Sequence, residues 1–283
     1  MVSLRNLIKL FALLRYFAAK TIGNFGYFYG QDRLVRFIYS PDVIYQDHKL
    51  AIDFRKIYFG NHYYGRTSEF IDWSVAIYGG AERPLIKEIL KIQKKYELGF
   101  FIDVGANTGT HTLALSNVVP CVAFEPLEVN FSRLENNIRK NQLKNPVTLF
   151  NYGLSDKDAR TEIFYNEDNC NFGAARIEAR PEDRANFSKS TIRLRRFDDA
   201  NVEVLGNSFF IKVDVEGYEF KVLEGMKNFL QQNKIRGYVE TEKKQVIELL
   251  NSIGFTVEYI ELKRMRVLRN QNQLAGHVFI SNF

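Results

Sequence analysis

The sequence has little of what a secreted, membrane-spanning or zinc-binding protein needs. Its 283 residues include only two cysteines, Cys121 and Cys170, which is too few for a disulfide framework or a zinc site. The most apolar stretch, residues 10–19, is interrupted by Arg15 and is far shorter than the roughly 20 residues of a membrane span. No internal repeat or low-complexity tract is visible. The composition predicts a packed globular protein in a reducing compartment, the cytoplasm.

Basic residues are concentrated near the N-terminus. The formal net charge is +6, and residues 1–40 hold six Lys or Arg residues against one acid, Asp32. A nucleic-acid footprint should cover the binding domain, so this distribution argues against a nucleic-acid partner. Residues 4–20 have apolar residues at helical spacing with Lys and Arg on another face, which predicts a basic amphipathic helix. Three partners stay open for it: its own domain, a second copy of the chain in a homo-oligomer, or peripheral contact with the inner face of a membrane.

The sequence divides into an N-terminal extension, residues 1–80, and an α/β domain, residues 81–283. After the basic helix, the extension is rich in Tyr, Phe and Ile and predicts short strands and loops. From residue 82 onward, predicted helices alternate with short apolar strands, a pattern typical of a mostly parallel sheet with helices on both faces. Residues 154–208 break this alternation, and we interpret them as an insertion over one end of the sheet.

A glycine-containing turn, residues 103–109, follows the first strand of the α/β domain directly. A phosphate-binding P-loop needs Gly and Lys where Thr110 and His111 stand, so this turn does not match one. A dinucleotide-binding turn needs glycines in place of Asn107 and Thr110, and it does not match either. The turn therefore predicts a ligand without a diphosphate, if it binds one at all.

Acidic residues flank this turn. Asp103 ends the first strand, where it would repel a diphosphate but suits a cation. S-adenosylmethionine carries an ammonium and a sulfonium group and no phosphate. Glu125 closes the next strand 20 positions after Gly105, a spacing at which an acid can accept both hydroxyls of a ribose. We therefore expect S-adenosylmethionine at this turn.

The chain resembles the FkbM family of S-adenosylmethionine-dependent methyltransferases over about residues 80–283. Five segments in order carry the resemblance: residues 101–113, 124–138, 151–156, 211–225 and 238–242. The resemblance implies a class I methyltransferase fold, which is Rossmann-like with a seven-stranded, mostly parallel sheet and an antiparallel last strand. It also implies O-methyl transfer, typically to a sugar, a glycan or a secondary metabolite.

The resemblance further implies which residues bind the cofactor. They are Asp103, Gly105, Ala106, Asn107, Gly109, Glu125, Pro126, Asn130 and Asn151. The family usually has a bulky aromatic residue at the position of His111, so the resemblance assigns His111 no catalytic role.

A second acidic group follows the strand of residues 208–213. The resemblance places this strand beside the one that ends at Asp103, so Asp214 and Glu216 should face the methyl group across a crevice. A carboxylate within hydrogen-bond reach can take the proton of a hydroxyl acceptor. We predict Asp214 or Glu216 as this base, with Glu240 as a third carboxylate. A structural role at a helix N-terminus and a Mg²⁺ site stay open, although no metal is predicted.

Other functions of the same fold class compete with the small-molecule or glycan O-methyltransferase. An RNA ribose methyltransferase stays open, although no N-P-P-[YF] run supports a nucleic-acid amino-methyltransferase. A nicotinamide-dependent oxidoreductase or epimerase is disfavoured by the missing glycines. A non-enzymatic membrane-associated module is disfavoured because Asp103, Glu125 and Asp214 are all present.

Overall fold

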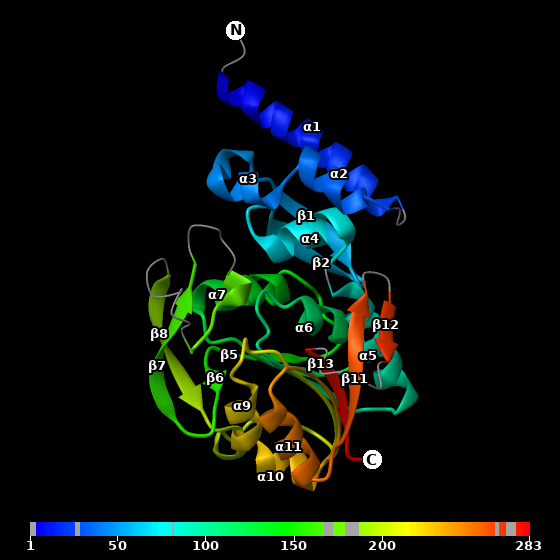
Figure 1. The fold of residues 1–283 in the computed structure, drawn as a ribbon, viewed down its shortest axis with the longest axis vertical. Coiled ribbons are helices and arrows are strands. Elements are labelled where there is room, and N and C mark those ends of the chain that lie inside the picture. Colours follow the sequence, from blue (N-terminus) through cyan, green and yellow to red (C-terminus); the bar gives the residue numbers. More distant parts are fainter. Residues whose placement is uncertain are drawn as a thin grey trace.

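In the computed structural model, eight strands form one mixed sheet at the centre of the molecule (Figure 1). The structure describes residues 4–25, 29–80, 82–166, 172–178, 187–263, 266–269 and 276–283. The strand order is β12-β11-β13-β10-β9-β3-β4-β5. The strands are β3 (Phe100–Val104), β4 (Cys121–Phe124), β5 (Val147–Phe150), β9 (Ser208–Val213), β10 (Lys234–Glu240), β11 (Thr256–Lys263), β12 (Arg266–Arg269) and β13 (His277–Ser281).

The predicted topology is confirmed in its main features. Strands β10, β9, β3, β4 and β5 are parallel neighbours, and β13 lies antiparallel between β10 and β11. The expected number of seven strands is corrected to eight, because β12 pairs antiparallel with β11 and extends that edge. A short hairpin of this kind needs no crossover helix, so helix–strand alternation does not reveal it.

Helices cover both faces of the sheet. They are needed there because successive side chains of each buried strand point to opposite faces and are apolar on both. On one face lie α5 (Arg83–Lys95), α6 (Thr110–Leu115) and α7 (Glu128–Arg139), and on the other lie α9 (Glu219–Gly225), α10 (Lys227–Gln232) and α11 (Lys244–Ser252). Within β3, Phe101 packs into the core under α5 and α6, whereas Ile102 packs into the core under α9–α11.

The predicted insertion forms a small sheet of its own in the order β6-β8-β7. Its elements are β6 (Gly153–Leu154), β7 (Ala159–Tyr165), η2 (Phe172–Ala174), β8 (Ser188–Arg195) and η3 (Phe197–Asp199). Ile163 of β7 and Ile192 of β8 join the same apolar core as β3 and β9. Residues 167–171 and 179–186 of the insertion lie outside the described residues.

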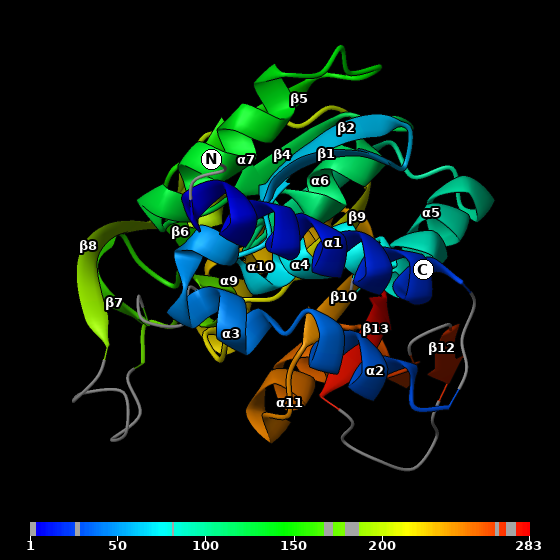
Figure 2. The same ribbon diagram turned by 90° about the horizontal axis from the view of Figure 1, so that it is seen from above.

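The N-terminal extension lies at one end of the molecule (Figures 1 and 2). It comprises α1 (Leu4–Asn24), α2 (Gln31–Ile38), α3 (Pro41–Gln46), η1 (His48–Leu50), β1 (Asp53–Tyr58), β2 (Asn61–Arg66) and α4 (Phe70–Tyr78). The predicted N-terminal helix and the short strands after it are present, whereas α2, α3 and α4 were not predicted. Helix α4 is buried continuously from Asp72 to Ile77, so it lacks the polar face that makes a helix recognisable in sequence.

Side-chain amides join the extension to α7. Asn137 Oδ1 accepts a hydrogen bond from the backbone N–H of Tyr64 at 2.9 Å. Asn141 Oδ1 accepts from His62 N at 2.7 Å, and its Nδ2 donates to His62 O at 2.8 Å. These amides pair with the edge of β2 as a neighbouring strand would, and they fix β2 against α7.

A buried ionic cluster reinforces this junction. Asp72 of α4 is fully buried, and its carboxylate pairs with the guanidinium of Arg133 on α7. Asp72 also accepts a hydrogen bond from Tyr63 Oη at 2.6 Å, and Glu69 Oε2 lies 3.3 Å from Arg133 Nη1. The cluster holds α4 over the carboxyl ends of the sheet strands.

Candidate active site

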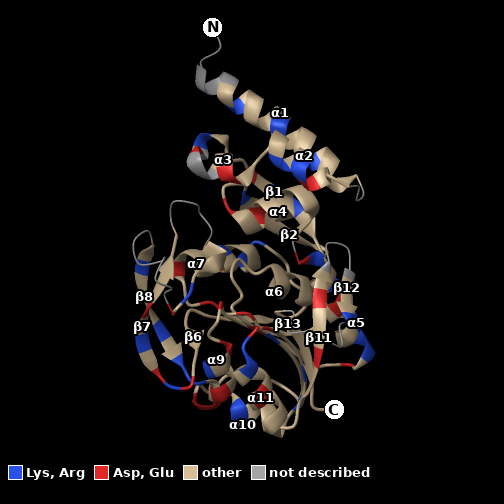
Figure 3. Ribbon diagram, viewed as in Figure 1, with Lys and Arg blue, Asp and Glu red and all other residues tan. Residues whose placement is uncertain are grey.

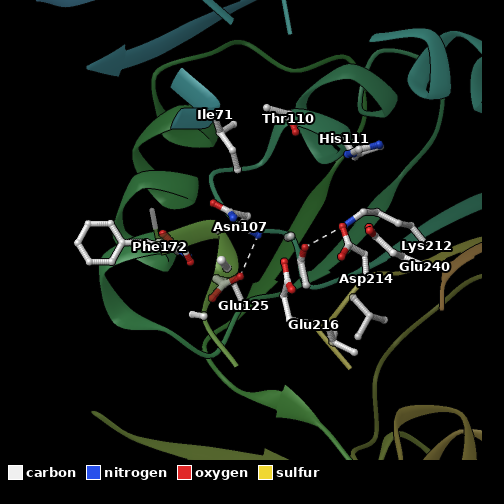
Figure 4. Close-up of a pocket in the computed structure, with 18 of the residues that line it drawn as sticks. Ile71, Asn107, Thr110, His111, Glu125, Phe172, Lys212, Asp214, Glu216 and Glu240 are labelled. Carbon is white, nitrogen blue, oxygen red and sulfur yellow. Dashed lines mark hydrogen bonds and ion pairs between the residues drawn. The ribbon is translucent and has the colours of Figure 1, made fainter. Parts of the chain in front are cut away.

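A cavity of about 380 Å³ lies at the carboxyl ends of β3, β4, β9 and β10 and is covered by α4 (Figure 4). This is the place where open α/β sheets bind ligands, and the volume falls within the range of small-molecule sites, about 300–1,000 Å³. The lining comes from all parts of the fold and includes Phe70, Ile71, Glu82, Gly105, Ala106, Asn107, His111, Glu125, Pro126, Asn130, Phe172, Lys212, Asp214, Glu216 and Glu240.

The turn after β3 forms one wall of this cavity. The backbone N–H groups of Gly105 and Ala106 both donate to Phe124 O, which fixes the turn to the end of β4. Gly105 has a φ of 80°, and an added Cβ would lie 1.9 Å from Asp214 O. A side chain at this position would therefore separate β3 from β9, and only glycine allows the strands to close here.

Glu125 is held against the turn by the backbone. Its Oε2 accepts from Asn107 N at 2.9 Å and its Oε1 from Leu127 N at 2.9 Å (Figure 4). Burial raises the pKa of Glu125 to about 7, although the two backbone hydrogen bonds oppose this shift. The side chain is therefore pre-positioned at the cavity wall.

Asn130 provides a polar group that the protein leaves unsatisfied. Its side chain is 2% exposed and lines the cavity. Asn130 Nδ2 donates to Phe172 O at 3.1 Å, but within the described structure Oδ1 has no hydrogen-bond partner. A buried acceptor without a partner costs free energy, so it fits a ligand that donates a hydrogen bond there. The wall formed by the turn, Glu125 and Asn130 thus suits a ligand with amino and hydroxyl groups.

Three residues expected at the cofactor lie outside the described lining of the cavity. Asp103 is fully buried beneath the turn, where it accepts from Thr112 Oγ1 at 2.6 Å. Gly109 begins α6 with a φ of 87° and packs against Leu134. Asn151 donates to Glu128 Oε2 at 2.6 Å on the protein surface. Their contacts hold the turn and its surroundings in shape, and direct contact of these three residues with a cofactor stays a prediction.

Opposite the turn, three carboxylates converge: Glu82, Asp214 and Glu240. Their oxygens lie within 4.8 Å of one another. Asp214 directly follows β9, and Glu240 ends β10, where the parallel register pairs Val239 with Val213. The predicted proximity of Asp214 and Glu240 is therefore present. Glu216 also lines the cavity but is exposed and lies outside this group of three.

Lys212 neutralises part of this negative charge from within β9. Its Nζ lies 3.1 Å from Asp214 Oδ2 and 3.6 Å from Asp103 Oδ1, and it donates to Gly105 O at 3.0 Å. Burial alone would lower the pKa of Lys212, but the surrounding carboxylates raise it above its usual value. The ammonium therefore stays charged and joins the ends of β3 and β9.

The carboxylates shift one another's pKa values. Burial, together with the nearby charges of Asp214 and Glu82, raises the pKa of Glu240 to about 9. Burial and the charge of Asp214 raise the pKa of Glu82 to about 7. Glu240 is therefore protonated at neutral pH and shares a hydrogen bond with Asp214. Glu82 is half ionised near pH 7, the state best suited to exchange a proton.

Sequence reasoning did not identify Glu82, Lys212 or His111 as members of the site. Lys212 was visible as a lone charge in an apolar strand, two residues before Asp214 and thus on the same side of the strand. Glu82 comes from the connection before α5, and only the fold brings it to the cavity. His111 Nδ1 lies 3.6 Å from Glu82 Oε2, and burial, followed by the charge of Lys212, lowers the pKa of His111 so that it is neutral.

The same three carboxylates also have the composition of a divalent cation site, because oxygen ligands suit Mg²⁺. The ammonium of Lys212 already pairs with Asp214, which reduces the charge left to hold a metal. The arrangement thus allows two kinds of chemistry, proton transfer and metal binding. Proton transfer needs only the side chains present, whereas the second requires a bound metal ion.

The sequence profile described as the methyltransferase FkbM domain matches residues 103–266, more than half of the chain. Among curated proteins, the hexuronic acid methyltransferase AglP of Haloferax volcanii is 29% identical over 167 residues, which cover 57% of this chain and 65% of that protein. The match decides against the nicotinamide-dependent oxidoreductase or epimerase considered above.

Solved structures of two methyltransferases are also similar. One is the methyltransferase FkbM from Methylobacillus flagellatus KT, with 17% identity, a TM-score of 0.43 and coverage of 65% of this chain and 44% of that one. The other is the magnesium protoporphyrin IX methyltransferase ChlM from Synechocystis PCC 6803, with 10% identity, a TM-score of 0.41 and coverage of 76% and 84%.

Proposed function

The chain belongs to the FkbM family of methyltransferases, and from this premise we propose that it transfers a methyl group from S-adenosylmethionine to a hydroxyl of a sugar or glycan. The observation that carries the proposal is the cavity with two unlike walls. One wall offers hydrogen-bonding groups around the glycine turn, and the other offers the carboxylates of Glu82, Asp214 and Glu240.

The cofactor would be held by the wall around the turn. When bound, S-adenosylmethionine supplies a methyl group on a sulfonium, already activated for displacement. Gly105, Ala106, Asn107 and Pro126, which line this wall, would hold it. Glu125 offers carboxylate oxygens to hydroxyls, and the free Oδ1 of Asn130 accepts a hydrogen bond. A cation also suits this cavity, since Glu82, Asp214 and Glu216 line it beside a single ammonium, that of Lys212, while the protonated Glu240 adds no positive charge.

The carboxylate wall would bind the acceptor and take its proton. Asp214 lies at the centre, fixed by Lys212 on one side and by the protonated Glu240 on the other. Glu82 faces the same space with a pKa of about 7, so it can hold the proton released by a hydroxyl at neutral pH. Alignment of the acceptor and exclusion of water supply the remainder of the catalysis.

The curated relative acts on a hexuronic acid, which has two kinds of oxygen that accept a methyl group. Methylation of a carboxylate gives an ester and needs no base, because a carboxylate has no proton to lose. A carboxylate placed beside Asp214 and the ionised form of Glu82 would be repelled by like charge. The charge of this wall therefore favours a hydroxyl as the reacting group, with any carboxylate of the sugar directed elsewhere.

Ligand-dependent stability tests the cofactor. S-adenosylmethionine or S-adenosylhomocysteine at about 100 times the dissociation constant should raise the free energy of unfolding by roughly 2.7 kcal/mol. NAD at equal concentration serves as the control and should have no effect. Stabilisation by NAD alone would contradict the proposal, and Glu125→Gln should weaken the response to S-adenosylmethionine.

Product chemistry tests the acceptor. The chain is incubated with S-adenosylmethionine and with matched pairs of neutral glycosides and uronic acid glycosides, and methylated sugars are analysed before and after mild alkali. An ether survives alkali, whereas an ester is hydrolysed. Alkali-stable methylation supports a hydroxyl acceptor, and alkali-labile methylation would show that the carboxylate is the reacting group.

A further inference from the structure

The outward face of α1 is apolar, whereas its inward face is already packed. Leu10, Leu14 and Phe17 are 54%, 61% and 56% exposed, and their spacing of three to four residues places them on one side of the helix. Phe11 and Leu13 flank them and are exposed as well. We call these five residues the α1 face. A surface helix ordinarily turns such residues toward its core.

The opposite side of α1 needs no further partner. Ala12 and Ala19 are buried there, and Tyr16 packs with Trp73 of α4 and Tyr39 after α2. The small alanines allow α1 to lie close to the rest of the extension. The α1 face therefore cannot turn inward without breaking this packing, and its apolar surface remains open to an external partner.

Neighbouring segments extend the apolar surface. Helix α2 packs beside α1 (Figure 2). It exposes Leu34 and Phe37, the latter by 84%. Phe25 and Tyr29, in the connection between the two helices, are 79% and 92% exposed. Aromatic residues of this kind are favoured at the boundary between lipid and water.

The charges around the α1 face identify the partner. The sequence of α1 contains basic residues and no Asp or Glu (Figure 3). Lys9 is exposed and Lys20 half-buried on its flank, and α2 adds exposed Arg33 and Arg36, of which Arg36 lies 3.9 Å from Asp42. From the apolar face and its basic border we propose that α1 docks onto the surface of an anionic lipid bilayer. A two-fold dimer through α1 would instead bring its basic residues together.

Docking of this kind leaves α1 in the plane of the membrane surface. None of the described helices is long and apolar enough to cross a bilayer. Apolar side chains enter the boundary between headgroups and acyl chains, while Lys and Arg contact the anionic headgroups.

The bound orientation would bring the cavity near the membrane. Helix α4 lies between them: Trp73, Ala76 and Ile77 face α1, whereas Phe70 and Ile71 line the cavity. One layer of helix, about 10 Å, therefore separates the docking surface from the site.

Vesicle flotation of the full chain tests the docking. The vesicles are phosphatidylcholine, either alone or with about 30 mol% phosphatidylglycerol to supply negative surface charge. The test variant is Leu14→Glu/Phe17→Glu, whose side chains are exposed, so the fold should be retained. The control is Val118→Glu/Leu205→Glu, which adds the same charge at two apolar residues that are 52% and 80% exposed elsewhere.

We expect the wild type and the control to float with anionic vesicles and to bind neutral vesicles more weakly. The test variant should bind anionic vesicles at least about tenfold less tightly, with an unchanged unfolding midpoint. Absence of wild-type flotation, or equal flotation of test variant and control, would overturn the proposal. Sedimentation equilibrium identifies the other occupant: a wild-type dimer that Leu14→Glu/Phe17→Glu dissociates, without vesicle binding, would assign the α1 face to a second copy.

Discussion

The central sheet and the N-terminal extension are fixed in the molecule by different interactions. Strands β3 and β9 bury apolar side chains on both faces, and many alternative side chains of similar size would preserve this packing. The extension adds Tyr58, Tyr63 and Val75 to the core under α5 and α6, but it is joined to α7 and the turn after it by polar contacts. These are the Asp72–Arg133 ion pair and the amides of Asn137 and Asn141. Each of these contacts depends on one donor meeting one acceptor.

Both regions contribute to the candidate site. The sheet supplies the turn, Lys212, Asp214 and Glu240. The extension and its connection to α5 supply Phe70, Ile71 and Glu82 to the same cavity. The polar junction therefore positions the part of the cavity wall that the extension supplies.

Among the changes considered, loss of Arg133 should lower the stability of the protein the most. Arg133→Met leaves the buried carboxylate of Asp72 without its cationic partner, and we expect a loss of about 3–5 kcal/mol in the free energy of unfolding. Urea denaturation measures it. The control is Arg139→Met on the same helix, whose exposed pair with Glu135 contributes at most about 1 kcal/mol. Equal effects of the two variants would show that the buried cluster does not hold the extension.

Asp214→Asn tests the sheet side of the cavity. We expect turnover to fall by about 10²-fold or more if Asp214 takes the proton, with the affinity for S-adenosylmethionine largely unchanged. Glu216→Gln is the matched control and should lose much less, because Glu216 lies outside the group of three carboxylates. Near-normal turnover of Asp214→Asn would show that Asp214 does not take the proton. Loss of wild-type turnover in EDTA, restored by Mg²⁺, would instead assign the carboxylates to a metal.

The pH dependence of kcat/KM tests the extension side. Glu82 must be ionised to accept a proton, and its pKa of about 7 lies above the usual value for Glu, so the active form is lost as pH falls below 7. We expect kcat/KM to decrease by up to about tenfold per pH unit below pH 7 and to level off above it. In Glu82→Gln the decrease of kcat/KM below pH 7 should disappear, and most of the activity should be lost. An unchanged profile in that variant would assign the titration to another group.

Removal of one junction amide should have the smallest effect. Asn141→Ala removes the hydrogen bonds to His62 N and His62 O, and we expect a loss of about 1–2 kcal/mol in the free energy of unfolding. Gln142→Ala, an exposed neighbour, should change it by less than about 0.5 kcal/mol. Thermal or urea unfolding of both variants measures the difference. An equal loss of stability in both variants would show that the Asn141 amide does not stabilise the junction.

The sheet was predictable because its signals are local. Alternating apolar strands and amphipathic helices follow from periodicity, and the glycine turn with Glu125 follows from spacing along one stretch of chain. Asp103 lies near the end of β3, and alternation along this strand turns its side chain into the core, toward Thr112 and Lys212. Its contact with the cofactor stays a prediction.

The extension was less predictable because its helices and contacts lack local signals. Helix α4 is buried on all sides, so it has no polar face to mark it. Asp72 lies 9 residues after Tyr63, and Arg133 lies 61 residues after Asp72, and no spacing rule relates the three. The members of this cluster are recognisable only when the fold has placed them.

By itself the sequence determined the α/β sheet, the turn at Gly105 and the acids that follow β9 and β10. These features depend on periodicity and on the order of strands, which short-range physical rules constrain. Only the tertiary structure decided that Glu82 rather than Glu216 joins Asp214 and Glu240, that Lys212 pairs with them, and that the apolar side of α1 faces outward. Each of these outcomes depends on which distant segments pack together, and packing in three dimensions is not encoded at any fixed sequence separation.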